Sequence, residues 1–158
     1  RIFCSPAPRA QKTASLVFPN YEKTTDARIR EIDMGEWEGQ LYSDISKKDP
    51  QQWHNFFYNP LDYKPNNGGE SYLELEKRLT SFIDMLEKET GDDDIIVVVS
   101  HHIAIRVLYH LLINKNIDKV GETPEILPNS VTVIDRNQGI YITNKFSCID
   151  HYKYKIYD

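Results

Sequence analysis

The sequence of 158 residues has few cysteines, no excess of basic residues and no long apolar segment. Its two cysteines, Cys4 and Cys148, have neither the number nor the spacing of a disulfide framework or a metal site, so we expect two reduced thiols in a cytoplasmic protein. The formal net charge of −5 argues against nucleic acid as the main partner, because duplex binding usually requires a basic face. No apolar run approaches the length that crosses a bilayer, and we expect no membrane partner.

The composition is that of an ordinary globular chain, with 40% hydrophobic and 27% charged residues. The length suits one domain, and no internal repeat or interior linker divides it, so we expect a single domain over residues 1–158. A small anionic ligand is compatible with the negative net charge, because a few local cations can dominate a pocket.

The strongest helical signal is the apolar spacing of 3, 4, 3, 4 from Tyr72 to Leu86. Ser71 and Glu74 form a capping-box pattern, which predicts where this helix begins. The following run, residues 95–99, is short and wholly apolar, which predicts a strand buried on both faces of a parallel sheet.

Weaker patterns predict the remaining elements. Ser5-Pro6 has the pattern of a helix N-cap followed by proline at the first helical position. The expected strands are residues 1–5, a short piece within 24–39, 95–99 and a terminal hairpin of 130–136 and 140–146. The expected helices are residues 6–18, 41–48, 50–58, 70–89 and 103–113.

Strands that alternate with helices indicate an α/β fold, and we expect a three-layer α/β/α sandwich with a central, mostly parallel sheet. In such a sheet, ligands bind beyond the carboxyl ends of the strands. Two strand-to-helix junctions, CSPAPRA and VVVSHH, place Arg9, His101 and His102 at that edge, beside helix N-termini. A guanidinium, imidazoles and two helix N-termini suit a phosphate best among common anions.

Four segments, in the order SPAPRAQKTA, REIDMGEWEG, GGES and VVVSHH, resemble motifs of the histidine phosphatase superfamily, the phosphoglycerate-mutase-like group. The first resembles its Ser-Pro-x-x-Arg-Ala-x-x-Thr-Ala segment, and the second its loop E-x-x-x-G-x-x-E-G. GGES leads into a long helix with an arginine, here Arg78, and VVVSH resembles the strand that delivers a catalytic histidine. The resemblance runs from residue 1 to about residue 134 and covers most of the chain.

The resemblance implies catalytic roles for His101 and Glu31 and phosphate binding by Arg9 and His102. His101 would hydrogen-bond the phosphoryl oxygens and stabilise charge in the transition state, while Glu31 would protonate the leaving oxygen. The family usually has glycine where this chain has His102, so we expect its backbone N–H to face the phosphate and its imidazole to narrow the pocket. Because phosphoryl transfer relies on positioning and electrostatics, we expect neither a metal ion nor a cofactor.

The family's nucleophile lies in an Arg-His-Gly motif well before the Ser-Pro segment, and these 158 residues contain no Arg-His-Gly. We therefore expect the nucleophile, with a central strand of the sheet, to lie upstream of Arg1. The expected function is then a phosphoric monoester hydrolase that acts on a small phosphorylated metabolite through a phosphohistidine. Two alternatives stay open, an inactive relative that binds a phosphorylated ligand or a protein partner, and a phosphoglycerate-mutase-type phosphotransferase. A homodimer also stays open.

The candidate site residues have structural alternatives. His101 has the alternative of a core histidine, and Arg9 that of a surface residue of a helix. Glu36 and Glu38 compete with Glu31 for the acid role, and the motif spacing alone selects Glu31.

Other conspicuous side chains are interpreted as structural. His54 and His110 lie in helical patterns, Trp37 is interpreted as a loop anchor, and Arg78 as a solvated helix residue or one half of an ion pair. The aromatic residues of segment 42–58 form either a lid over the substrate or ordinary packing.

Overall fold

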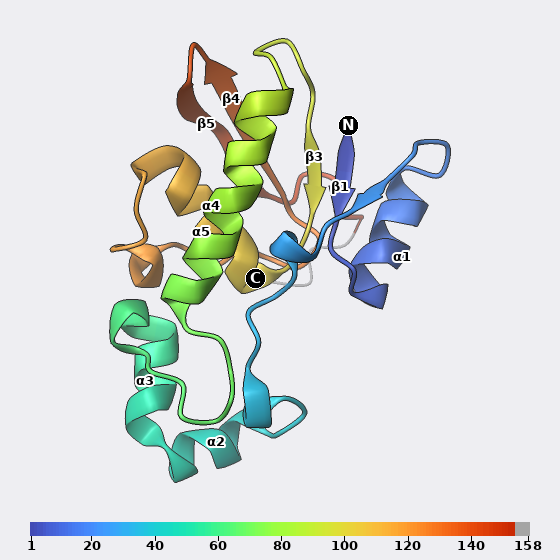
Figure 1. Cartoon of the computed structure of the whole chain (residues 1–158). Coiled ribbons are helices and arrows are strands. Elements are labelled where there is room, and N and C mark those ends of the chain that lie inside the picture. The colour runs from blue at the N-terminus through green and yellow to red at the C-terminus, as the bar shows by residue number, and fades with distance from the viewer. Residues whose placement is uncertain (154–158) are drawn as a thin grey trace.

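The computed structural model describes residues 1–153 and has helices on both faces of a small parallel sheet (Figure 1). Residues 154–158, the end of the predicted domain, lie outside the described residues. The strands are β1 (Ile2–Cys4), β2 (Thr24–Thr25), β3 (Val97–Val99), β4 (Val131–Asn137) and β5 (Ile140–Cys148). The α-helices are α1 (Pro8–Val17), α2 (Tyr42–Lys48), α3 (Pro50–Tyr58), α4 (Tyr72–Glu89) and α5 (His102–Asn114). Short 3-10 helices are η1 (Ala27–Ile29), η2 (Gly35–Trp37), η3 (Pro60–Asp62) and η4 (Val120–Glu122).

The central sheet has the strand order β2-β1-β3, and both pairings are parallel. Neighbouring residues of β1 face opposite sides, as the pleat of a strand requires. Phe3 packs with α4 and α5 in the main core, whereas Cys4 packs with Ala10 and Ala14 of α1. The predicted α/β fold with a parallel sheet between helices is therefore confirmed.

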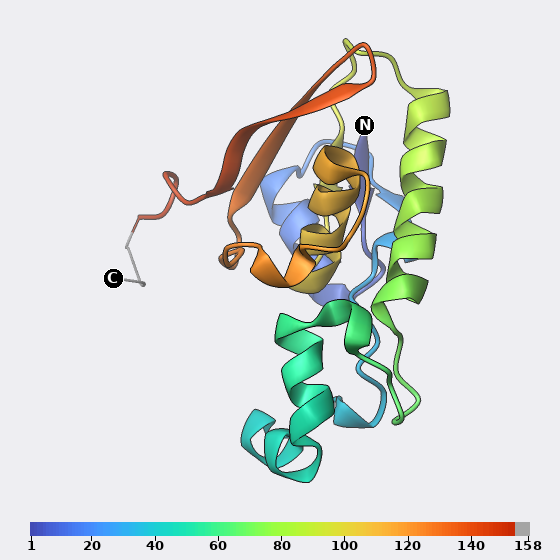
Figure 2. The same cartoon turned by 90° about the vertical axis from the view of Figure 1, so that its left-hand side faces the viewer.

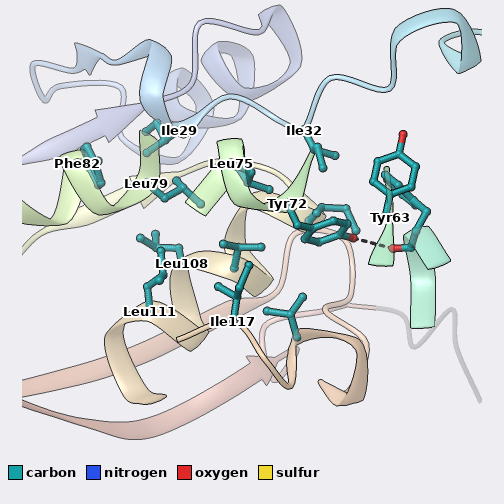
Figure 3. Packing of buried hydrophobic residues seen from close by; sticks show 14 of the residues in the cluster. Ile29, Ile32, Tyr63, Tyr72, Leu75, Leu79, Phe82, Leu108, Leu111 and Ile117 are labelled. Carbon is teal, nitrogen blue, oxygen red and sulfur yellow. Dashed lines mark hydrogen bonds between the residues drawn. The ribbon is translucent and has the colours of Figure 1, made fainter. Parts of the chain in front are cut away.

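Helix α4 follows from its sequence pattern. Its capping box is formed, since the Ser71 side chain accepts the Glu74 N–H and the Glu74 carboxylate accepts the Ser71 N–H. Leu75, Leu79 and Phe82 are fully buried along one face of the helix. Figure 3 shows this face packed against residues of α5 and of the segment that follows β2.

Strands β4 and β5 form a separate antiparallel hairpin that packs on α5 (Figure 2). The Tyr109 and Phe146 rings are 4.9 Å apart, and the Tyr109 hydroxyl lies 3.0 Å from Oγ1 of Thr143. Within residues 1–153, β3 pairs only with β1 and β4 pairs only with β5, so each has one edge without a strand partner. No helix of this part of the chain is long and apolar enough to cross a membrane.

Two local predictions were wrong. The segment 95–99 is not a strand buried on both faces, because Ile95 is 81% exposed and β3 is only half-buried, with no strand along its second edge among residues 1–153. Ser5 is not the N-cap of α1, which begins at Pro8 after the extended Ala7. The Ser5 hydroxyl is instead directed to His101, which lies beyond the end of β3.

Candidate active site

Two neighbouring parallel strands carry the first part of the site at their carboxyl ends. Ser5 directly follows β1, and its backbone N–H donates to the Val99 carbonyl of β3 at 2.9 Å. His101, two residues after Val99, is thereby placed beside Ser5, and the distance from His101 Nε2 to Ser5 Oγ is 2.7 Å. Both side chains are buried. Parallel pairing of β1 and β3 thus brings together residues that are 96 positions apart in the chain.

Arg9 fixes the protonation of the His101 ring. The Arg9 Nε–H donates to His101 Nδ1 at 3.2 Å, so Nδ1 accepts and the ring proton of a neutral imidazole lies on Nε2, toward Ser5. Burial, and then the positive charges of Arg9 and Arg78, lower the pKa of His101 to about 4. The imidazole is therefore neutral near pH 7 until an anion approaches it.

Glu31 lies at the N-terminus of α5. Its Oε1 accepts the backbone N–H groups of Ala104 at 2.9 Å and of Ile32 at 3.0 Å, and its Oε2 accepts that of Ile103 at 3.2 Å. Burial raises the pKa of this carboxyl above its ordinary value, although the three backbone donors and the charge of Arg9 favour the ionised form. A carboxyl with a raised pKa suits the donation of a proton.

His102 begins α5, one residue before the predicted start of this helix, and His101 is its N-cap residue. The His102 side chain is exposed, and its backbone N–H has no hydrogen-bond partner among residues 1–153. Because Ile103 and Ala104 already donate to Glu31, the His102 N–H is the donor that this helix end leaves for a further anion.

The structure brings the predicted residues together. Arg9 contacts His101, Glu31 binds the N-terminus of the helix that His102 begins, and the competing acids Glu36 and Glu38 are exposed. The arrangement offers a guanidinium, an imidazole and a backbone N–H to an oxyanion, with a carboxyl alongside. Among the described residues, no group of histidine, cysteine and acidic side chains gathers in a metal-binding arrangement.

Sequence reasoning missed the residues that hold Glu31. Arg78 does not lie on a solvated helix face; the alternative of an ion pair is confirmed, with Glu70 as the partner at 2.6 Å. Arg78 also donates to backbone carbonyls next to Glu31. The available signal was its position three residues after Leu75 and four before Phe82, on the apolar side of α4.

Glycine at position 35 lets the Glu31 loop meet the loop before α4. Gly35 has φ +56°, and a Cβ there would overlap the Asn67 carbonyl oxygen and lie 2.5 Å from the Gly69 nitrogen. We expect Gly35→Ala to lower the free energy of unfolding by about 3 kcal/mol. Two costs add up here: the strain of a positive φ in alanine, and the clash of its Cβ with the backbone of the loop before α4. Gly39→Ala is the control, since Gly39 has φ +75° but open space, and only about 1 kcal/mol is expected. Urea unfolding measures both, and equal losses would contradict the clash.

The aromatic residues that follow the Glu31 loop form one cluster. Trp37, the predicted loop anchor, is buried and packs against Trp53, Phe56 and Tyr63. This contact confirms Trp37 as an anchor. The remaining aromatic residues of segment 42–58 divide into the half-buried Phe57 and the exposed Tyr42 and Tyr58.

The other histidines of the helices lie away from His101. His110 is buried and lies 2.6 Å from Thr123 Oγ1 and 2.8 Å from Asn114 Nδ2, which confirms its structural interpretation. His54 is exposed and packs on the Tyr58 ring.

The family model described as Histidine phosphatase superfamily (branch 1) matches residues 1–147. The chain belongs to this superfamily. One curated relative is Phosphoserine phosphatase 1 of Hydrogenobacter thermophilus, 30% identical over 120 residues that make up 75% of this chain and 56% of the relative. A second is 6-phosphofructo-2-kinase/fructose-2,6-bisphosphatase of Arabidopsis thaliana, 27% identical over 99% of this chain and 19% of the relative.

Two solved structures share the fold of this chain. The structure of Bacillus stearothermophilus YhfR aligns with a TM-score of 0.84 and 25% identity, over 95% of this chain and 74% of that chain. A putative alpha-ribazole-5'-P phosphatase from Escherichia coli aligns with a TM-score of 0.77 and 24% identity, over 92% of this chain and 71% of that chain. The chain spans about half of the length of the first curated relative and a fifth of the second.

Proposed function

We propose that this chain is part of a phosphoric monoester hydrolase that acts on a small phosphorylated metabolite through a phosphohistidine. The observation that carries the proposal is the contact of Arg9 and Ser5 with the two ring nitrogens of His101, beside the N-terminus of α5 and the Glu31 carboxyl. The names of two curated relatives, a phosphoserine phosphatase and a bisphosphatase, support phosphate esters of small metabolites as the substrate class.

Each residue has a distinct role in this proposal. The Arg9 guanidinium, which contacts the N-cap residue His101, and the His102 N–H at the same helix end bind the phosphoryl oxygens. His101 is neutral in the free protein, and an approaching phosphate dianion raises its pKa, so a charged imidazole can stabilise the transition state. Glu31 gives its proton to the ester oxygen as the bond from phosphorus to that oxygen breaks.

The nucleophile in this proposal is a histidine outside these 158 residues. Its ring nitrogen forms the bond to phosphorus, and in the second step water attacks phosphorus while Glu31 takes a proton from that water. The phosphohistidine bond then breaks, which releases phosphate and restores both groups. Among residues 1–153, β3 and β4 each leave one edge of backbone N–H and C=O groups without a strand partner, and these edges support a further strand as the carrier of this histidine.

Trapping of the intermediate tests the proposed function. The intact protein, with any segment that precedes Arg1, is mixed with substrate labelled at phosphorus and quenched in alkali, in which phosphohistidine survives. The expected result is acid-labile label on a histidine that precedes Arg1. Label on His101, or turnover without labelled protein, would overturn the assignment of the nucleophile.

Two further measurements on the intact protein separate the alternatives. Binding of inorganic phosphate without any turnover favours an inactive relative that binds phosphorylated ligands. Transfer of label to an added alcohol acceptor, in preference to water, favours a mutase-type phosphotransferase.

A further inference from the structure

The Arg78 side chain uses its whole guanidinium to hold the segment around Glu31. Its Nη1 donates to the carbonyl oxygens of Arg28 at 2.5 Å and Arg30 at 2.9 Å, and its Nη2 donates to that of Glu31 at 3.0 Å. The remaining two donors bind the Glu70 carboxylate, from Nε at 2.6 Å and from Nη2 at 2.7 Å. An arginine has five N–H donors, and all five have acceptors here.

Glu70 holds the same segment from its other end. Both of its carboxylate oxygens accept from Arg78, and one of them also accepts the Asp33 N–H at 3.3 Å. The Glu70 backbone N–H in turn donates to the Asp33 carbonyl at 2.7 Å. The Arg78–Glu70 pair therefore fixes carbonyl or amide groups on both sides of Glu31, and both side chains are largely shielded from solvent.

The segment around Glu31 is also hydrogen-bonded to the elements on either side of His101, which are β3 and α5. The Ser100 hydroxyl, at the end of β3, donates to the Ile29 carbonyl at 2.7 Å. The Glu31 carboxylate binds the first turn of α5. Figure 1 shows the segment after β2 passing beside α4 on its way to η2. The backbone of Glu31 is thus attached to α4, while its carboxyl reaches α5.

We propose that the Arg78–Glu70 pair is a positioning unit that holds the Glu31 carboxyl where it protonates the leaving group. This inference rests on the proposed function, because it takes Glu31 as the general acid. Neither Arg78 nor Glu70 has to contact the substrate. Their effect passes through the backbone of residues 28–33, and a displacement of that backbone moves the acid away from the leaving oxygen.

Lysine cannot replace Arg78 in this position. It keeps the positive charge beside Glu70 but has one nitrogen, which cannot serve three carbonyls and two carboxylate oxygens in a planar arrangement. Arg78→Lys therefore loosens the segment without leaving the buried Glu70 carboxylate unpaired. A double variant, Arg78→Met with Glu70→Gln, removes both charges together and provides a second protein with the same expected defect.

The test compares two substrates of the intact protein that differ in their leaving group. An alkyl phosphate needs a proton on its leaving oxygen, whereas p-nitrophenyl phosphate expels a stable anion and needs little help from an acid. We expect Arg78→Lys to lower kcat/KM by about 10²-fold for the alkyl phosphate and only a few-fold for p-nitrophenyl phosphate. The double variant should show the same ratio.

Two further variants make the result decisive. Arg136→Lys is the matched control, because Arg136 also joins a carboxylate, that of Asp92, to the Thr90 carbonyl, but contacts none of the four candidate site residues. Arg136→Lys should leave kcat/KM for both substrates near the wild-type values, and any small loss should be equal for the two. Glu31→Gln should reproduce the loss that is selective for alkyl phosphate. If it does and Arg78→Lys lowers both activities in parallel, the positioning proposal fails alone; if Glu31→Gln shows no selectivity, the proposed acid role fails.

Discussion

Replacement of His101 with alanine should lower kcat/KM of the intact protein toward a small phosphate monoester by about 10³-fold or more. The His101 ring connects Arg9 and Ser5, since Arg9 donates to its Nδ1 at 3.2 Å and its Nε2 lies 2.7 Å from Ser5 Oγ. Its loss removes a donor to the phosphoryl oxygens, and with it the charge that an approaching phosphate induces by raising the pKa of His101 from about 4. Initial rates across substrate concentrations measure the loss.

His110→Ala is the matched control for this variant. His110, in α5, is likewise a buried histidine with two side-chain partners, Thr123 and Asn114, but it lies about two and a half helical turns beyond His101. Both variants should lose a similar free energy of unfolding, about 1–3 kcal/mol, because each leaves polar partners unpaired. Only His101→Ala should lose turnover. A destabilised His101→Ala variant with normal kcat/KM would instead assign His101 to the core.

The elements of the fold could be predicted because their signals are local. The spacing of Leu75, Leu79 and Phe82 determines which face of α4 is buried, and the Ser71–Glu74 capping box determines where it starts. The burial of β3 could not be predicted from such a local pattern. A run of apolar residues indicates a strand, but its exposure depends on which strands lie beside it, and that is a property of the tertiary structure.

The candidate site also has residues that could be predicted from the sequence and residues that could not. Arg9, His101 and His102 could be placed together because parallel strands deliver their carboxyl-terminal residues to one edge of a sheet. Ser5 was assigned to a helix cap, because a hydroxyl before a proline has that local pattern, whereas its partner in the structure is His101.

The contacts that hold the segment around Glu31 could not be predicted from the sequence, for a different reason. Arg78 binds carbonyl oxygens of the Glu31 segment, and a backbone carbonyl has no signature in the sequence. The sequence motifs include both GGES and the arginine of α4, yet only the structure shows that Glu70 and Arg78 form one unit.

Replacement of Glu31 with glutamine should lower kcat/KM for an alkyl phosphate by about 10²- to 10⁴-fold, because the amide has no proton to give. The wild-type rate should fall as pH rises through the pKa of Glu31, since only the protonated carboxyl is an acid. Burial raises that pKa, so the fall should come at a higher pH than for an exposed glutamate. The residual rate of Glu31→Gln should show no such fall.

Glu36→Gln is the control for the pH profile. Glu36 lies in the same loop, is exposed, and makes none of the contacts with α5 that Glu31 makes. Its variant should keep both the rate and the wild-type decline at high pH. Loss of that decline in Glu36→Gln, with Glu31→Gln unchanged from wild type, would transfer the acid role to Glu36. Because Glu31 alone among the acids of this loop binds the first turn of the helix that follows His101, we expect the opposite result.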